Sequence, residues 1–207
     1  MNMLEESRND LTEIRLMMDR SSKFLSLSGL GGISAGIVAL IGSAIAYYQI
    51  RSNETSAQPK NLTDLFFLDA CVMLVLAIGL AMAFSIRMAK KKGLPVWNHT
   101  TKYLIGSLMV PLATGGIFSI ILWYHGLVIF IAPSTLVFYG LALINSSKFT
   151  VNEIRYLAFG EIVLGLLAAM LLEQWLLLWA IGFGVLHIVY GIFLYMKYEH
   201  EKNRPTT

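Results

Sequence analysis

Apolar residues in this chain gather into six long runs that polar and charged stretches separate. The runs are long enough to span a membrane, because an α-helix of about 20 apolar residues crosses a bilayer. They are apolar without interruption, whereas the strands of a membrane β-barrel alternate apolar and polar residues. The pattern predicts an all-α, polytopic membrane protein, a six-transmembrane-helix bundle with spans at 24–50, 65–88, 103–124, 127–144, 154–172 and 175–196.

Composition agrees with this prediction. The 207 residues are 56% hydrophobic and 14% charged, whereas soluble domains carry about 25% charged residues. The six runs take up most of the chain and leave no room for a soluble catalytic domain. We therefore expect a transmembrane domain over 24–198 and a cytosolic tail at 199–207.

Lys and Arg are distributed unequally between alternate connections of the runs. Fourteen of the sixteen lie in the N-terminal segment, the second and fourth connections and the C-terminal tail, and the other two are Arg51 and Lys60. Short loops rich in Lys and Arg stay in the cytoplasm. Both termini are therefore expected to be cytoplasmic. The net charge of +3 reflects this bias, so the lipid bilayer is the expected partner and nucleic acid is not.

Residues 1–23 have a different pattern. Leu4, Leu11, Ile14 and Met18 recur at heptad-like spacing among charged residues, which predicts a short cytosolic amphipathic helix. Such a helix lies on the membrane surface or packs on itself in one interpretation. In the other, it docks a protein partner or mediates self-association.

Small residues and prolines mark some of the predicted helices. Gly32 and Gly36 belong to a row at four-residue spacing, which lets helix backbones approach closely in lipid. Pro111 and Pro133 lie within the third and fourth runs, where each is expected to remove a backbone donor and kink its helix.

Two ionisable residues lie deep inside the predicted spans, Glu161 in the fifth and His187 in the sixth. Folding these spans into an antiparallel hairpin about residues 173–174 places Glu161 and His187 at the same depth. Ionisable groups are costly inside a bilayer and usually face the interior of the bundle. The sequence predicts that the two side chains meet in the cytoplasmic half.

Three interpretations of this pair remain open: a hydrogen-bonded pair that locks the last two helices, a site for a proton or small solute, and part of a metal site. Two ligands alone do not define a metal site, so we predict none, and no motif indicates a cofactor. Tyr139, Tyr190 and Asn145 are candidate neighbours of the pair by depth. The best functional hypothesis is binding or translocation of a small solute or proton at this site, and the main alternative is a non-enzymatic subunit or regulator.

One string matches a hydrolase motif. Gly32-Ile-Ser34-Ala-Gly36 fits G-x-S-x-G, and Ser34 lies near the depth of His187. This resembles the serine–histidine dyad of rhomboid intramembrane proteases. Rhomboids, however, carry the serine on a middle helix and have His and Asn on the second, and the second run here has neither. Helix packing is the expected role of the string, with an intramembrane hydrolase as a remote alternative.

Two longer stretches carry a resemblance to a known group. Residues 138–148 and 179–191, which include the Gly182-Phe-Gly184 segment and His187, resemble a family of uncharacterised six-helix bacterial membrane proteins. The resemblance implies a location in the bacterial inner membrane. It implies no activity, cofactor or substrate.

Overall fold

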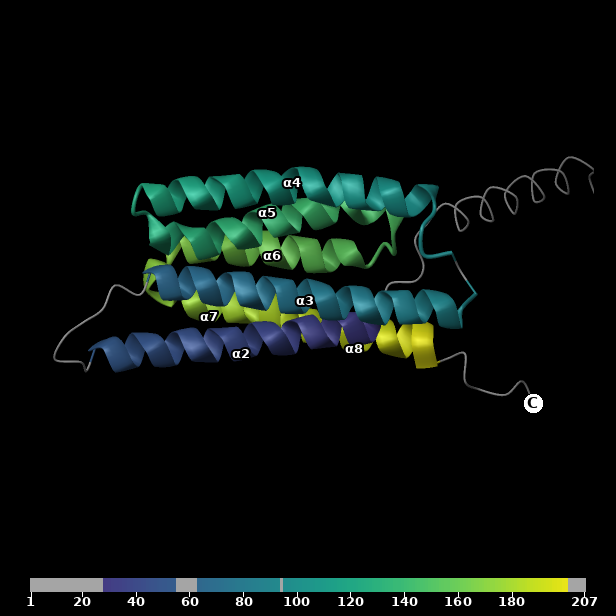
Figure 1. Cartoon of the computed structure of the whole chain (residues 1–207), viewed down its shortest axis with the longest axis horizontal. Helices are drawn as coiled ribbons and strands as arrows, with labels where there is room; N and C mark the ends of the chain where they lie inside the picture. Colours follow the sequence, from purple (N-terminus) through teal and green to yellow (C-terminus); the bar gives the residue numbers. More distant parts are fainter. Residues whose placement is uncertain (1–27, 55–62, 94, 201–207) are drawn as a thin grey trace, which may run out of the picture.

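The computed structural model describes residues 28–54, 63–93 and 95–200, and most of them are helical. Within this part of the chain, six long helical segments run back and forth (Figure 1). The predicted helix at 1–23 and most of the tail at 199–207 lie outside the described residues. The first three segments are single helices: α2 (Gly29–Glu54), α3 (Thr63–Lys91) and α4 (His99–Tyr124).

The last three segments combine helices of different type. The fourth consists of the 3₁₀ turn η1 (Val128–Phe130), α5 (Ile131–Ser146) and the 3₁₀ turn η2 (Ser147–Phe149). The fifth is α6 (Ile154–Met170), which the short turn η3 (Leu172–Gln174) joins to the sixth. The sixth consists of α7 (Trp175–Trp179), the π-helical segment η4 (Ala180–Leu186), α8 (His187–Tyr195) and the π-helical turn η5 (Met196–His200).

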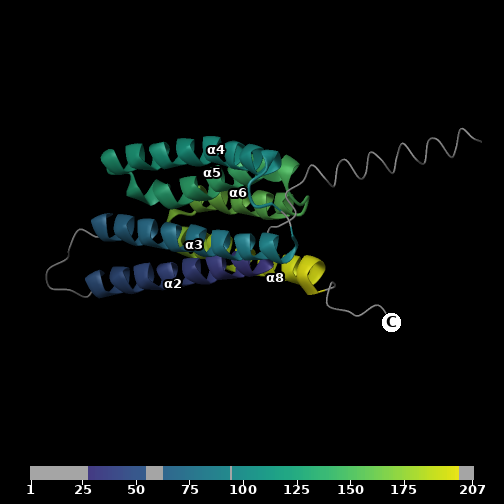
Figure 2. The ribbon, with the colours of Figure 1, turned by 45° about the vertical axis from the view of Figure 1, so that its right-hand side comes forward.

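The helices form two groups of three that lie side by side (Figures 1 and 2). In one group α5 packs against both α4 and α6, and in the other α2 packs against both α3 and the sixth segment. The groups meet where α5 and α6 contact α7 and η4. The seam between the groups therefore runs beside α6 and η4.

Glycines bring α2 and the sixth segment into backbone contact. A Cβ added at Gly36 would lie 2.6 Å from the carbonyl oxygen of Gly184, and one at Gly32 would lie 3.2 Å from Cα of Gly191. The four-residue row predicted for the first span thus faces the last one. Close approach of this kind strengthens van der Waals packing, which is the main attraction between helices in lipid.

The start of α4 and the position of Pro133 in its helix differ from the sequence prediction. α4 begins at His99, four residues early, because Asn98 Oδ1 accepts a hydrogen bond from the Thr101 N–H at 2.8 Å and caps the helix. Pro111 lies inside α4 as predicted. The prediction for Pro133 was wrong, because this residue lies in the first turn of α5, where backbone N–H groups have no intrahelical partner to lose.

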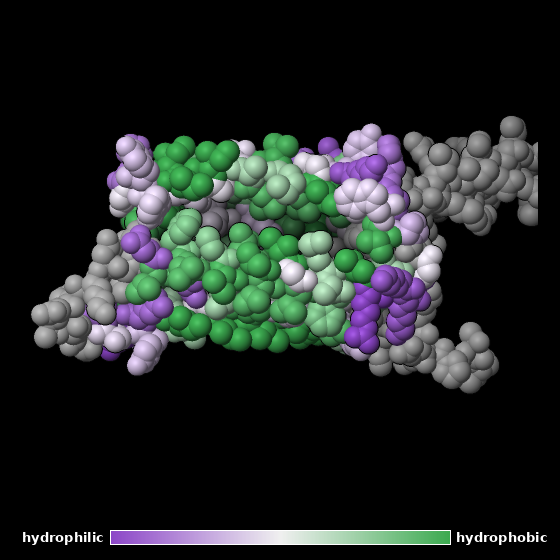
Figure 3. Space-filling view, in the orientation of Figure 1, coloured by the Kyte–Doolittle hydropathy of each residue, from purple (hydrophilic) through white to green (hydrophobic). Residues whose placement is uncertain are grey.

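The surface divides into an apolar belt and polar ends. Figure 3 shows apolar residues over the middle of the visible face and polar residues at both ends of the bundle. Within the described residues, five segments are long and apolar enough to cross a membrane by length and composition, and α6, with 17 residues, is shorter. These features suggest a membrane protein.

Candidate functional site

Three side chains from different helices meet at the seam between the two groups. Nδ1 of His187, the first residue of α8, lies 3.3 Å from Oε1 of Glu161 on α6. Nε2 of the same ring lies 2.8 Å from the hydroxyl of Tyr139 on α5. Glu161 and His187 thus meet at one depth, as the hairpin geometry predicts. We call Glu161, His187 and Tyr139 the buried triad.

The hydrogen bonds of His187 assign its protons. Nδ1 lies 3.2 Å from the carbonyl oxygen of Gly182, which can only accept, so Nδ1 carries a proton. In the neutral ring Nε2 is then the acceptor, and the Tyr139 hydroxyl donates to it. If Nε2 is protonated, the same hydroxyl turns and accepts. Tyr139 can therefore serve both protonation states of the ring.

The carboxyl group of Glu161 is enclosed by the protein. Its side chain has 0% exposure, and neither oxygen has a hydrogen-bond partner within the described residues. Oε1 is within ion-pair distance of His187 Nδ1, but the ring N–H is directed at the Gly182 carbonyl. A buried carboxylate without hydrogen-bond donors is costly. The ionised form of Glu161 therefore depends on electrostatic attraction from the nearby Nδ1–H group of His187.

An aromatic wall continues from the buried triad. The ring of Phe183 stacks on His187 at 5.8 Å between centroids and lies 5.0 Å from Tyr139. Trp179 follows at 4.9 Å from Phe183, and its Nε1 donates to Thr135 Oγ1 at 3.2 Å. These rings place apolar surface around the imidazole of His187 and restrict the orientation of its ring.

The π-helical segment η4 completes the site, and the sequence did not predict it. Gly182 and His187 are five residues apart, which is the hydrogen-bonding interval of a π-helix, and π-helical turns are frequent at functional sites. A Cβ added at Gly182 would lie 2.7 Å from Oε2 of Glu161 and 2.5 Å from Cδ2 of Leu136. The Gly182-Phe-Gly184 spacing was the available signal, since only glycine fits beside the carboxyl group.

The other two candidate neighbours lie outside the triad. Asn145 is exposed, and its Nδ2 donates to the carbonyl oxygen of Ser107 at 2.7 Å, which joins α5 to α4. Tyr190 packs against the same apolar cluster as Tyr139, but its hydroxyl is buried without a hydrogen-bond partner among the described residues.

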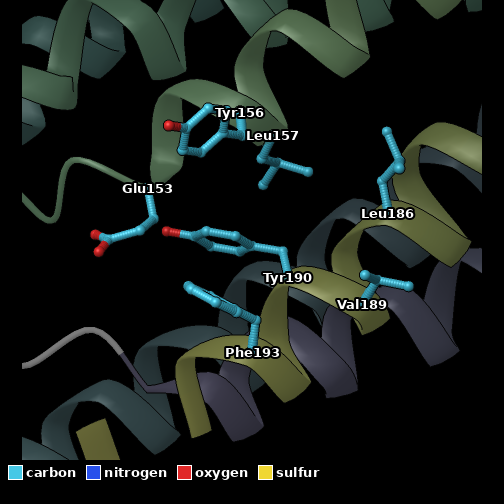
Figure 4. Close-up of a pocket in the computed structure, with 7 residues that line it drawn as sticks. All are labelled: Glu153, Tyr156, Leu157, Leu186, Val189, Tyr190 and Phe193. Carbon is cyan, nitrogen blue, oxygen red and sulfur yellow. The ribbon is translucent and has the colours of Figure 1, made fainter. Parts of the chain in front are cut away.

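Tyr190 borders a groove of about 370 Å³ between α6 and α8. Figure 4 shows its side chain extending from α8 across the groove, with the hydroxyl toward the end where Glu153 lies. Glu161 and His187 do not line this α6–α8 groove, although each lies close in sequence to a residue that does. Its full lining is Glu153, Tyr156, Leu157, Leu186, Val189, Tyr190 and Phe193.

A polar cluster lies at the Glu153 end of the groove. Oε1 of Glu153 accepts hydrogen bonds from the Lys197 ammonium and, at 3.1 Å, from the Tyr198 hydroxyl. Partial burial raises the pKa of Glu153, but the hydrogen bonds and the charge of Lys197 outweigh it and lower the pKa below its usual value. Glu153 therefore stays ionised at neutral pH.

The remaining sequence candidates have other roles in the described structure. Ser34 donates its hydroxyl to the Gly31 carbonyl oxygen at 2.9 Å within α2. Both ring nitrogens of His187 are engaged elsewhere, so the serine–histidine dyad is not formed. Across the described residues, no group of three or more His, Cys, Asp or Glu side chains could hold a metal ion.

Comparison with known proteins adds no relative. No protein-family model, no curated protein and no solved structure matches the chain. The functional conclusion therefore depends on the geometry of the site.

Proposed function

We propose that this chain is an integral membrane protein that binds a proton at the buried triad, in a bacterial inner membrane. One observation carries the proposal: the fully buried carboxyl group of Glu161 lies 3.3 Å from an imidazole whose other nitrogen is bonded to a tyrosine hydroxyl. Ionisable groups buried at membrane depth are expensive, and they commonly mark proton or ion pathways.

The charge distribution supports the proposed orientation. Among the described residues, the end of the bundle that holds the last turn of α3, with Lys90 and Lys91, carries most of the Lys and Arg side chains. By the positive-inside rule this end faces the cytoplasm, together with both chain termini. Glu153 and Lys197 lie at the same end, so the α6–α8 groove opens on the cytoplasmic side.

The packing favours a proton over a larger solute. Not even a methyl group fits between Gly182 and the Glu161 carboxyl group, and the exposed fraction of His187 is 6%. A solute would need a cavity bordered by Glu161 or His187, and the α6–α8 groove is bordered by neither. A proton needs only a hydrogen-bonded route.

The triad can change its proton content with little movement. A proton that arrives at Nε2 of His187 converts the ring to imidazolium beside Glu161, and the Tyr139 hydroxyl turns from donor to acceptor. The new positive charge is then within ion-pair distance of the carboxylate. Loss of that proton reverses the change.

Proton uptake by the purified protein tests this proposal. Protein in phosphatidylcholine vesicles is shifted from about pH 8 to about pH 5, the range in which histidine titrates, and pyranine fluorescence reports the protons bound. Wild-type protein should bind more protons than Glu161→Gln and His187→Gln. Glu173→Gln, which removes an exposed carboxyl group, is the control and should retain the uptake.

Equal uptake by wild type, Glu161→Gln and His187→Gln would contradict the proposal. The pair would then be a structural lock between the fifth and sixth helical segments.

A further inference from the structure

The hydroxyl of Tyr190 is the unexplained polar atom next to the buried triad. It is buried, and it has no hydrogen-bond partner among the described residues. Leaving a buried hydroxyl unsatisfied costs about 1–3 kcal/mol, so the group calls for an explanation. Phenylalanine would fill the same volume without that cost.

Tyr190 lies between the triad and the polar cluster at the end of the groove. It follows His187 by three residues, about 4.5 Å along the helix toward the cytoplasmic end. Glu153 precedes Glu161 by eight residues, or about 12 Å. Tyr190 therefore falls between the two levels. Its ring also packs against the apolar cluster that Tyr139 contacts.

Apolar side chains make up the rest of the inner groove. Leu157 from α6 and Leu186, Val189 and Phe193 from the sixth segment offer no oxygen or nitrogen to carry a proton. The titratable groups near Tyr190 are Tyr139 from α5, Glu153 just before α6 and Tyr198 from η5, with Lys197 beside Glu153 and Tyr156 on the groove wall. Among the residues that line the groove, Tyr190 is thus the polar link between its mouth and the triad.

We propose that Tyr190 relays protons between the cytoplasmic mouth of the α6–α8 groove and the buried triad. This inference rests on the proposed proton-binding function. A proton from water at the mouth of the groove binds to a lone pair of Tyr190 Oη. The O–H proton that Tyr190 already held moves to Tyr139 Oη, directly after a side-chain rotation or through one water.

The last transfer completes the balance. Tyr139 passes its own hydroxyl proton to Nε2 of His187, and each tyrosine ends with one proton as it began. The net result is one proton moved from the mouth to the imidazole. Tyr190 thereby acts as a positioning and relay residue that controls the rate of protonation but not the affinity of the triad.

A pH-jump experiment separates rate from affinity. Infrared difference spectra of the protein in phosphatidylcholine vesicles follow the carboxylate stretch of Glu161, which shifts when the neighbouring His187 becomes imidazolium and which the loss of the band in Glu161→Gln assigns. Tyr190→Phe should slow the relaxation by roughly tenfold or more, equivalent to at least about 1.4 kcal/mol in the barrier. Its final amplitude and pH midpoint should match wild type.

Two variants support the interpretation. Tyr156→Phe removes a hydroxyl from the same groove wall, but Tyr156 is 81% exposed, and the variant should relax at the wild-type rate. Phe193→Trp narrows the groove without changing Tyr190, and it should slow the relaxation because water reaches Tyr190 through the groove. This variant also provides a second test of the relay if Tyr190→Phe does not fold.

The outcomes distinguish this inference from the proposed function. Wild-type rates in both Tyr190→Phe and Phe193→Trp, with an intact Glu161 band, would overturn the relay and leave the proton site standing. Absence of any pH-dependent band that Glu161→Gln removes would overturn the proton site and the relay together.

Discussion

At the scale of single residues, the site depends on which groups are paired and which are not. Tyr139 and Tyr190 are both half-buried tyrosines near His187, but the Tyr139 hydroxyl is bonded to the imidazole and the Tyr190 hydroxyl is not. Sequence could place both near the depth of His187, because depth follows from counting residues. It could not assign the hydrogen bonds, which depend on the rotamers and on η4.

The two tyrosines give a matched test of this difference. Tyr139→Phe leaves Nε2 of His187 without a partner and should lower the free energy of unfolding by about 1–3 kcal/mol. Tyr190→Phe removes a hydroxyl that has no partner and should cost little or stabilise the protein. Denaturant titration in detergent, followed by circular dichroism, measures both. Equal losses would contradict the assigned hydrogen bonds.

The polar cluster at the groove mouth predicts a pH dependence. The lowered pKa of Glu153 means that the ionised group stabilises the fold above its ordinary pKa of about 4.5, and this stabilisation is lost as the pH falls through the lower folded value. Glu153→Gln should therefore lower the melting temperature at neutral pH. The difference from wild type should shrink below about pH 4.5. Glu173→Gln, at an exposed position, should show no such trend, and a constant difference for Glu153→Gln would exclude the ionic contribution.

At the scale of helices, the positions of the turns predicted which residues lie at the same level of the bundle. The tight turn at Glu173-Gln174 was enough to bring Glu161 level with His187. Depth alone failed for Asn145, because this residue follows Tyr139 by six positions, which rotates it by about 240° to another face of α5. Periodicity missed η4, since a π-helical turn in an apolar run changes no pattern of hydrophobic positions.

Backbone contact between α2 and the sixth segment leads to a prediction for Gly191. A Cβ at this position would lie 2.6 Å from both the carbonyl oxygen of Gly29 and the backbone nitrogen of Ile33. Because backbone atoms cannot move aside cheaply, Gly191→Ala should destabilise the protein by about 1–3 kcal/mol. Gly116→Ala in α4, which meets nothing within 4 Å, is the control and should change stability by less than about 1 kcal/mol. Similar melting temperatures for the two variants would contradict the packing of α2.

At the scale of the whole molecule, the charge bias and the helix arrangement agree. An even number of helical segments places the first residue of α2 and the end of α8 at the same end of the bundle (Figure 1). Contact between Gly29 and Tyr195 shows the same arrangement. The hydrophobic runs were sufficient to predict the six helical segments, since a long apolar stretch satisfies its backbone hydrogen bonds as a helix. The positions of Lys and Arg add the orientation, which stays a prediction.

The proposed orientation predicts which turns are reached from each side. In a Cys71→Ser background, His125→Cys lies in an outer turn and should react with a membrane-impermeant maleimide on intact cells stripped of their outer membrane. Lys91→Cys, at the cytoplasmic end of α3, should react only after permeabilisation. Both positions are exposed, so access to the reagent depends on the side of the membrane. The reverse pattern would invert the orientation and place the groove mouth outside.

The protonation of His187 in a bilayer tests the central claim most directly. Solid-state NMR of protein with ¹⁵N-labelled histidine, compared with His187→Gln for assignment, reports both ring nitrogens. Spectra are collected between about pH 8 and about pH 5. The proposal predicts a neutral ring protonated at Nδ1 and, once the triad has taken up a proton, an imidazolium ring, with an altered ratio of the two in Glu161→Gln. A single protonation state in all spectra, unaffected by Glu161→Gln, would contradict a proton-binding triad.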